Sequence, residues 1–450
     1  MLGCDMGTLF KVVVAGGSYQ EGLTTHLQGV PPGLLITEEE IYRELLVRKP
    51  GQGELTSPRR EPDIPIIYSG VNAVDTMPGF ANAGYTNGTP LVILIPNLDR
   101  HFEHIEQYQV TNRTPRPGHA SYASYRKYGE WDDAIGAGFF SGRYTATIVA
   151  AGAVAKRVLR DHGIEVTGYV KEAAGVRMPE LPLGEIRPKV AAYKEVRRLH
   201  DPVYQAIFAS GRIRQGMRFL GKMTVLAEFE KHIPELKWPA MDEEAIRKEH
   251  GIHPKLNCPH LPTADEMYRR IIAITESGDS SGGVVEVVAT GVPAGMGEPV
   301  FQKLDAELGR MMGIGTVKAV EIGAGMAAKD STGSQFNDQM HVEGGEACPE
   351  QSRRVKFRSN NAGGITGGLA TGQPIVVRLA VKPTPTIARP QHTIDKVSLE
   401  NKELAAVTRR DPTIVPRVWP VAEAYMAIVL LDQYMMHAAY QAMGRGVAGR

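Results

Sequence analysis

A short turn rich in glycine and proline occurs twice in the chain, each time after a run of residues with strand character. The first copy is Gly29-Val-Pro-Pro-Gly33, and the second is Gly291-Val-Pro-Ala-Gly295. The apolar runs Lys11–Gly17 and Val284–Ala289 lie upstream of these turns. Such a repeated order of strand, turn and helix predicts an internally repeated α/β fold.

A helix is predicted after each turn. Thr37 is a suitable N-cap for the first helix, and Glu40, three residues later, completes a capping box. The spacing of apolar residues then predicts a helix over about 38–47, with a counterpart over 301–308 after the second turn.

Further strands and helices follow from the remaining apolar pattern. Strands are predicted at Leu91–Ile95, Val317–Ile322 and Ile375–Val381. Helices are predicted over 145–160 and from about Val421 to the end of the apolar pattern.

One segment, from about residue 194 to 260, differs from its surroundings. It is rich in Lys and Arg and has a helical pattern with bulky apolar residues such as Phe219, Phe229 and Trp238. We therefore predict a single domain of residues 1–450 with a helical insertion at about 194–260.

Composition excludes several classes of protein. Among 450 residues there are 51 Lys plus Arg and 50 Asp plus Glu, so no excess of positive charge favours nucleic acid as a partner. The three cysteines, Cys4, Cys258 and Cys348, form no close pair, which is typical of a reducing compartment. We expect a cytoplasmic protein.

No membrane partner is expected either. The first residues lack the basic start and long apolar centre of an export signal. The long apolar segment Ala424–Met443 contains Asp432 and His437, which favours a buried helix over a membrane span.

Cationic residues gather beside turns that contain glycine or proline. A single arginine is most often a solvated surface charge. Several guanidinium groups that converge on one pocket match the geometry of carboxylates and phosphates, which favours a small anionic substrate with several charges. The residues concerned are Arg48, Lys49, Arg59, Arg60, Arg113, Arg116, Arg143, Arg409, Arg410 and Arg417.

Other motifs are less specific. The glycine-rich stretch Gly363–Gly368 lacks the spacing of a dinucleotide or Walker loop and is first interpreted as a tight turn. Lys382–Thr386 offers an ammonium group and two hydroxyls, which suit a cofactor phosphate and an ordinary loop equally.

Metal binding and covalent hydrolysis receive little support. His101 with His104, or His253 with Cys258 and His260, give incomplete ligand sets, so no metal site is predicted. No Gly-x-Ser-x-Gly nucleophile motif is present in the sequence.

Taken in order, the motifs resemble those of the chorismate synthase family over nearly the whole chain. They are Gly29-Val-Pro-Pro-Gly33, Arg48-Lys-Pro-Gly-Gln52, Arg59-Arg-Glu-Pro-Asp63, Arg116-Pro-Gly-His-Ala120, the Gly291–Phe301 stretch, Val320-Glu-Ile-Gly323, Ala362-Gly-Gly364, Lys382-Pro-Thr384 and Arg409-Arg-Asp-Pro412.

The resemblance implies a fold, a reaction and partners. The fold would be an α/β sandwich of internally repeated β-α-β units, assembled as a homotetramer. The reaction would be the 1,4-elimination of phosphate from 5-enolpyruvylshikimate 3-phosphate to give chorismate, a step of the shikimate pathway. The cofactor would be reduced FMN, with NADPH as a candidate reductant.

The resemblance also implies roles for individual residues. His119, Asp411 and Tyr19 would be catalytic, with Asp411 assisting proton removal near the flavin. The substrate would be bound by Arg48, Arg116, Arg143 and Arg409. The flavin contacts would be Ser141, Gln335, Gly367, Lys382, Pro383, Thr384, Pro385, Thr386 and Arg409.

Four positions depart from the family pattern. Tyr19 replaces a catalytic histidine, Glu54 replaces an arginine, Phe139 lies in a stretch that has lost two cations, and Asn361 replaces a histidine. Two alternatives therefore stay open at the level of sequence. The flavin pocket could serve a different anionic substrate, or the chain could be a binding protein without catalysis.

Overall fold

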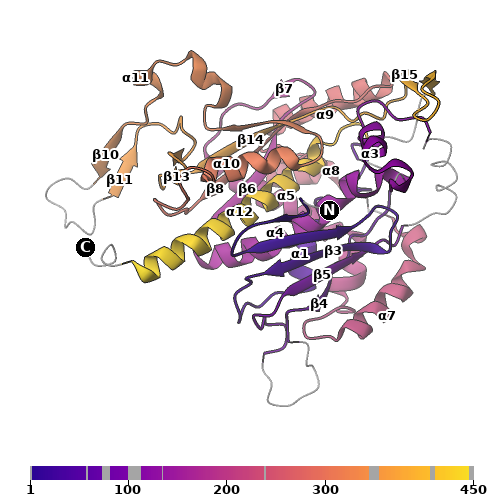
Figure 1. Ribbon diagram of the computed structural model, residues 1–450, viewed down its shortest axis with the longest axis horizontal. Coiled ribbons are helices and arrows are strands. Elements are labelled where there is room, and N and C mark those ends of the chain that lie inside the picture. Colours follow the sequence, from indigo (N-terminus) through magenta and orange to yellow (C-terminus); the bar gives the residue numbers. More distant parts are fainter. Residues whose placement is uncertain are drawn as a thin grey trace.

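Two five-stranded antiparallel sheets enclose a pair of long helices (Figure 1). The computed structural model describes residues 3–56, 59–72, 82–99, 113–133, 135–237, 240–343, 354–405 and 411–444. The first sheet has the strand order β1 (Asp5–Met6), β2 (Lys11–Gly16), β3 (Gly22–Gln28), β5 (Leu91–Pro96) and β4 (Ile66–Ser69). The second has the order β7 (Val176–Arg177), β6 (Glu165–Ala173), β8 (Gly283–Thr290), β14 (Ile375–Val381) and β9 (Val317–Ile322).

The central layer consists of α4 (Thr145–Asp161) and α12 (Val415–Met443), which pack on each other and on both sheets. They approach closely at Gly152, where an added Cβ would lie 2.3 Å from Cβ of Ala424. Within α12, the buried Asp432 accepts hydrogen bonds from the backbone N–H groups of Leu9 and Phe10 at 2.7 and 2.8 Å. A carboxylate that binds backbone donors explains the charge in this apolar helix.

The predicted internal repeat is confirmed. In one half β3 leads through the Gly29 turn to α1 (Glu38–Leu45), and in the other β8 leads through the Gly291 turn to α10 (Leu304–Gly309). Gly29 and Gly291 have φ values of 78° and 76°, and an added Cβ would lie 1.9 and 2.0 Å from a carbonyl oxygen. Only glycine suits such a backbone position.

The strands and helices that local signals predict individually are all present in the structure. Thr37 and Glu40 form the predicted capping box, and β14 has the predicted bounds. Two predicted starts are wrong: α10 begins three residues later, at Leu304, and α12 begins at Val415 rather than near Val421. Strands β3 and β6 are absent from the sequence-based prediction.

Helices occur throughout residues 183–276, a longer stretch than the predicted 194–260. They are α5 (Leu183–Leu199), α6 (Pro202–Tyr204), η4 (Gln205–Ala209), α7 (Phe219–Glu230), η5 (Ile233–Glu235), α8 (Glu243–His250) and α9 (Leu261–Glu276). We call residues 183–276 the helical segment.

The remaining elements are short helices and strands outside the two five-stranded sheets. They are α3 (Ser121–Tyr128), η1 (Gly129–Trp131), η2 (Ile135–Phe140), η3 (Gly142–Tyr144), η6 (Arg310–Gly313), η7 (Gly325–Asp330), α11 (Gly333–Phe336), β10 (Met340–Glu343), β11 (Arg354–Phe357), β12 (Ile365–Thr366), β13 (Leu369–Ala370), β15 (Gln391–Ile394) and β16 (Asn401–Leu404). In Figure 1, α11, β10 and β11 lie at the end opposite to α3 and β15.

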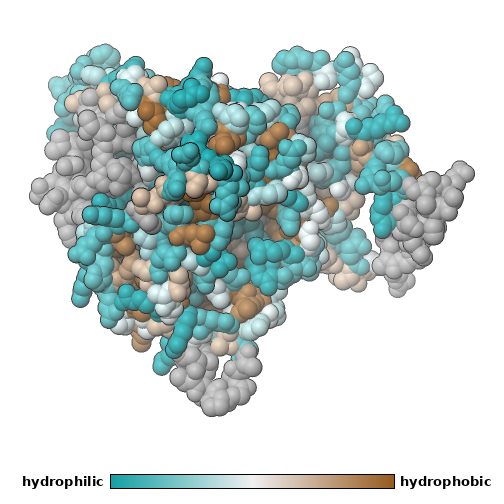
Figure 2. All heavy atoms as spheres, turned by 180° about the vertical axis from the view of Figure 1, so that it is seen from behind, coloured by the Kyte–Doolittle hydropathy of each residue, from teal (hydrophilic) through white to brown (hydrophobic). Residues whose placement is uncertain are grey.

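Among the described residues, none of the helices has the length and apolar character that crossing a membrane requires. The face seen from behind mixes hydrophilic and hydrophobic residues (Figure 2).

Candidate active site

Two of the predicted arginines meet at one buried aspartate. Arg48 Nη1 lies 2.7 Å from Oδ2 of Asp63, and Arg143 Nη1 contacts Oδ1 of the same side chain. Arg143 also lies 3.5 Å from Glu61 Oε1. All four side chains are buried. This group, which we call the ion cluster, joins the residues after α1 to the start of α4.

Burial and mutual charge set the protonation of the ion cluster. Burial would raise the pKa of Asp63, but attraction to Arg143 and Arg48 lowers it. Burial lowers the pKa of Arg48 to about 10, with attraction to Asp63 opposing the change. Burial also raises the pKa of Glu61. Asp63 is therefore the firmly ionised carboxylate that balances the two arginines.

The Tyr19 loop, between β2 and β3, is fastened to the ion cluster through Asn97. The Nδ2 group of Asn97 donates to the carbonyls of Gly17 and Gln20 at 2.9 and 2.8 Å, while its Oδ1 accepts from Nε of Arg143 at 2.9 Å. The guanidinium of Arg59 lies 5.4 Å from the Tyr19 ring centroid. Tyr19 thus lies beside a cation, on a loop held by the ion cluster.

His119 lies against the predicted flavin segment. Its Nε2 is 3.5 Å from Oγ1 of Thr386, and Lys382 Nζ donates to the carbonyl of Gly118 at 2.7 Å. Burial and the nearby charge of Arg116 lower the pKa of His119 to about 4, so the ring is neutral near pH 7.

Asp411 connects this segment to the ion cluster. Thr384 Oγ1 donates to the carbonyl of Asp411 at 2.6 Å. The Asp411 carboxylate lies 3.8 Å from Arg417 Nη1, and Arg417 Nε donates to the carbonyl of Arg48 at 3.1 Å. A continuous chain of contacts therefore runs from Thr384 to Arg48.

Ser141 belongs to the same region. Its Oγ accepts from the N–H of Arg143, and the following η3 ends at Tyr144, whose hydroxyl accepts from the N–H of Gly315 at 3.0 Å. The next residue, Thr316, accepts a hydrogen bond from the N–H of Lys382 through its carbonyl. The structure thus brings Ser141 and Lys382 to the same side of the molecule.

Two predicted flavin contacts lie elsewhere. Gln335 in α11 follows β9, and Gly367 in the β12–β13 hairpin precedes β14, so both are at the Ile375 end of β14. Lys382 follows the other end, about 20 Å away at about 3.3 Å per residue. Figure 1 shows α11 and β13 far from α3. Of the other predicted residues, Arg409, Arg410, His101 and His104 lie outside the described ranges.

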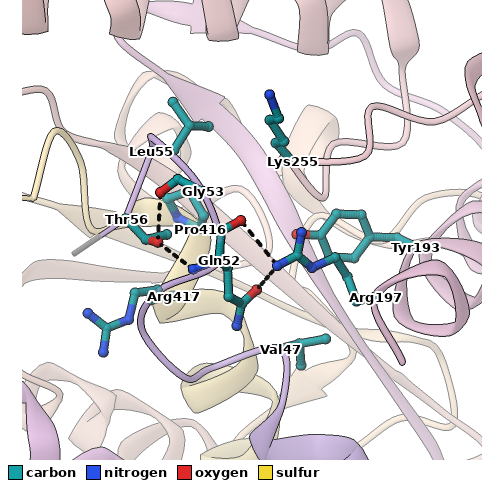
Figure 3. A pocket seen from close by; sticks show the side chains of 10 residues that line it. All are labelled: Val47, Gln52, Gly53, Leu55, Thr56, Tyr193, Arg197, Lys255, Pro416 and Arg417. Atoms are coloured by element: carbon teal, nitrogen blue, oxygen red, sulfur yellow. Dashed lines mark hydrogen bonds between the residues drawn. The ribbon is translucent and has the colours of Figure 1, made fainter. Parts of the chain in front are cut away.

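The helical segment explains one departure from the family pattern. Glu54 accepts hydrogen bonds from Lys255 at 2.7 Å and from the Tyr268 hydroxyl. The same turn is held by Arg197 of α5, which donates to the backbone carbonyl and Oε1 of Gln52 (Figure 3). Glu54 is thus an anchor for the helical segment.

The other departures have local partners as well. Phe139 stacks on Tyr144, with ring centroids 5.9 Å apart, and Phe140 lies 6.5 Å from Tyr128. Asn361 donates through Nδ2 to the carbonyls of Gln335 and Phe336 and so supports α11.

Sequence reasoning does not identify Asp63 and Asn97 as central residues. Asp63 is part of a quoted motif, and Asn97 stands at the end of a predicted strand. Arg417 is one of the cations beside turns. No sequence signal shows that these three residues connect the predicted site residues to one another.

Comparison with known proteins gives consistent results. The family model for chorismate synthase matches residues 10–435. The chorismate synthase of Acetivibrio thermocellus is 36% identical over 465 residues, which cover 100% of this chain and 99% of the relative. That of Methanocella arvoryzae is 37% identical, covering 96% and 94%. A crystal structure of chorismate synthase, 26% identical, superimposes with a TM-score of 0.61 and covers 96% of this chain and 93% of its own.

Proposed function

The chain belongs to the chorismate synthase family, and we propose that it binds reduced FMN and its substrate where His119, Lys382 and Asp411 come together. It is a carbon–oxygen lyase of the shikimate pathway, which eliminates phosphate from 5-enolpyruvylshikimate 3-phosphate to give chorismate. The shared function of its relatives does not favour the two alternatives, a different substrate or a protein without catalysis.

The observation that supports this site most strongly is the packing of the His119 turn on the Lys382–Thr386 segment. An added Cβ at Gly118 would lie 2.8 Å from Pro385, and φ there is 74°, so only glycine permits this approach. Asp411 joins the segment through Thr384. An imidazole, a carboxylate, an ammonium group and several hydroxyls therefore share a small region.

These residues suit a flavin phosphate. Lys382 provides an ammonium group, and Ser141 and Thr386 provide hydroxyls, which are good partners for phosphate oxygens. The buried Nδ1 of His119 makes no hydrogen bond of normal geometry within the described part of the chain, although the backbone of Pro117 lies close enough to affect the pKa of the ring. When bound, reduced FMN supplies transient electron density as phosphate leaves.

The predicted flavin contacts Gln335 and Gly367 lie about 20 Å from Lys382, so a single chain does not bring all of the predicted flavin contacts together. In the expected homotetramer, a second copy of the chain would bring such residues to Lys382. This would complete the set of flavin contacts that one chain leaves about 20 Å apart.

The chain's own residues have separate tasks in the proposed reaction. The neutral His119 donates a hydrogen bond to the leaving phosphate, and a bound anion would favour its protonated form. The Asp411 carboxylate accepts the proton that leaves the substrate ring. The Tyr19 hydroxyl takes the place of the family's catalytic histidine as a hydrogen-bond donor. Its reference pKa of about 10 makes it a weak acid.

The predicted substrate arginines divide into two groups. Arg48 and Arg143 are buried and bound to Asp63, so we propose that they position the site, Arg143 by holding the Tyr19 loop through Asn97. Arg116, next to His119 in the same turn, is the proposed direct contact with the substrate, together with Arg409.

Turnover of two variants tests this proposal. Asp411→Asn should lower kcat by a factor on the order of 100, as expected for loss of a positioned base. Lys382→Gln should mainly weaken FMN binding. Lys329→Gln, which removes an exposed lysine in η7, is the matched control and should leave both quantities unchanged. Wild-type turnover in Asp411→Asn would contradict the assignment.

A further inference from the structure

A cleft lies between the main body and the helical segment. Its volume is about 490 Å³, within the range of small-molecule sites. The Lys49–Gly53 turn and residues 60–62 form one side, and the helical segment forms the other. None of the predicted catalytic, substrate or flavin residues lines this cleft.

Glu61 provides a buried polar group in this cleft. Its side chain is 1% exposed. Oε1 accepts a hydrogen bond from the N–H of Leu98 at 2.9 Å, whereas Oε2 has no partner among the described residues. A buried oxygen without a partner is costly in a folded protein unless a ligand or water satisfies it.

Two cations of the lining are available to a ligand. Among the described residues, no carboxylate forms an ion pair with Arg60 or Lys237; Arg60 Nη1 donates to the carbonyl of Pro234 at 2.6 Å. Lys255, in contrast, is neutralised by Glu54 and Glu243, each at 2.7 Å. The cleft thus has free positive charge on one part of its wall.

The remaining wall is apolar. Pro50, Pro62, Leu236 and Met241 contribute flat or flexible hydrophobic surface. A methionine sulfur makes favourable contacts with aromatic rings. An aromatic ring therefore suits this wall better than a highly polar group does.

We propose that the cleft binds a small hydroxylated aromatic carboxylate. Its carboxylate pairs with Arg60 and Lys237, its ring packs on the apolar wall, and its hydroxyl meets Glu61 Oε2. Because Glu61 Oε1 lies 3.5 Å from Arg143, the ligand is also linked to the ion cluster.

Calorimetry on the full chain tests this proposal with 4-hydroxybenzoate as the probe. We expect saturable binding, with benzoate weaker by about tenfold because it lacks the hydroxyl. Lys237→Gln should weaken binding about fivefold. Lys231→Gln, an exposed lysine outside the cleft in the same segment, should bind like the wild type.

Three results would overturn the proposal. One is the absence of binding at millimolar concentrations of the probe. Another is equal affinity for 4-hydroxybenzoate and phenol, which would exclude the carboxylate contact. The third is binding lost in Lys382→Gln but kept in Lys237→Gln, which would place the probe in the candidate active site.

Discussion

Arg48 and Asp63 form a buried ion pair, with Nη1 of the arginine 2.7 Å from Oδ2 of the aspartate. Arg143 occupies the other oxygen of the same carboxylate. Asp63 therefore holds together two arginines that are 95 positions apart in the sequence, and the arrangement of the site depends on this one side chain.

Asp63→Asn should destabilise the protein by about 3–5 kcal/mol, because it leaves the buried guanidinium of Arg48 without its counter-charge and leaves Arg143 with only the more distant Glu61. The backbone at Asp63 has a φ of 52°, which asparagine also tolerates, so the change tests charge alone. Denaturant unfolding measures this loss.

The control for that variant is Asp161→Asn. It removes an exposed partner of Arg157 and should cost less than about 0.5 kcal/mol. Equal losses in the two variants would show that the ion cluster is not essential for stability.

Glu54 and Lys255 should be energetically coupled. Glu54→Arg places a cation next to Lys255 and should lower stability, and adding Lys255→Glu should restore part of the loss. Since both side chains are partly exposed, a coupling free energy of about 0.5–1 kcal/mol is expected. A double-mutant cycle in denaturant measures it, and strictly additive effects would rule out the pairing.

How far the sequence predicts this structure depends on the range of the signal. The capping box of Thr37 and Glu40 is local, and it predicts the start of the helix correctly. Strand β6 is missed because Gly168 and Lys171 interrupt its apolar pattern. Tertiary packing favours glycine at position 168, since an added Cβ would make a tight contact of 3.1 Å with the carbonyl oxygen of Trp419.

The arrangement of the candidate active site also depends on contacts between distant segments, which the sequence does not reveal. The order of the motifs does not reveal that Arg48 and Arg143 share Asp63, because this pairing joins distant segments. The start of α12 is predicted too late because Pro420 is typical of a helix break. Burial of Trp419 in the central layer outweighs that local preference.

His119 should respond to an anion. Its pKa is lowered to about 4, so between about pH 4 and 6.5 the folded state binds fewer protons than the unfolded state, and stability falls as pH falls through this window. Bound sulfate should raise the pKa of His119 by at least about one unit. An NMR titration with and without sulfate measures the shift.

His253 is an internal control for that titration. Burial lowers its pKa to about 4 as well, but it lies in the helical segment. Sulfate should leave the His253 titration unchanged. A pKa of His119 that does not move at saturating sulfate would show that the anion does not bind beside it.

Tyr19 should limit the rate. Tyr19→His introduces a stronger acid near neutral pH and should increase phosphate release, whereas Tyr19→Phe removes the hydroxyl and should decrease it. Initial rates under anaerobic conditions measure both effects. If neither substitution changes the rate, Tyr19 has no catalytic role.

The most direct test of the proposed function is an anaerobic assay of phosphate and chorismate with 5-enolpyruvylshikimate 3-phosphate as the substrate. With FMN reduced by dithionite, we predict equal amounts of phosphate and chorismate, and no turnover with oxidised FMN. No release of phosphate with reduced FMN, or equal rates with both redox forms, would contradict the proposed function.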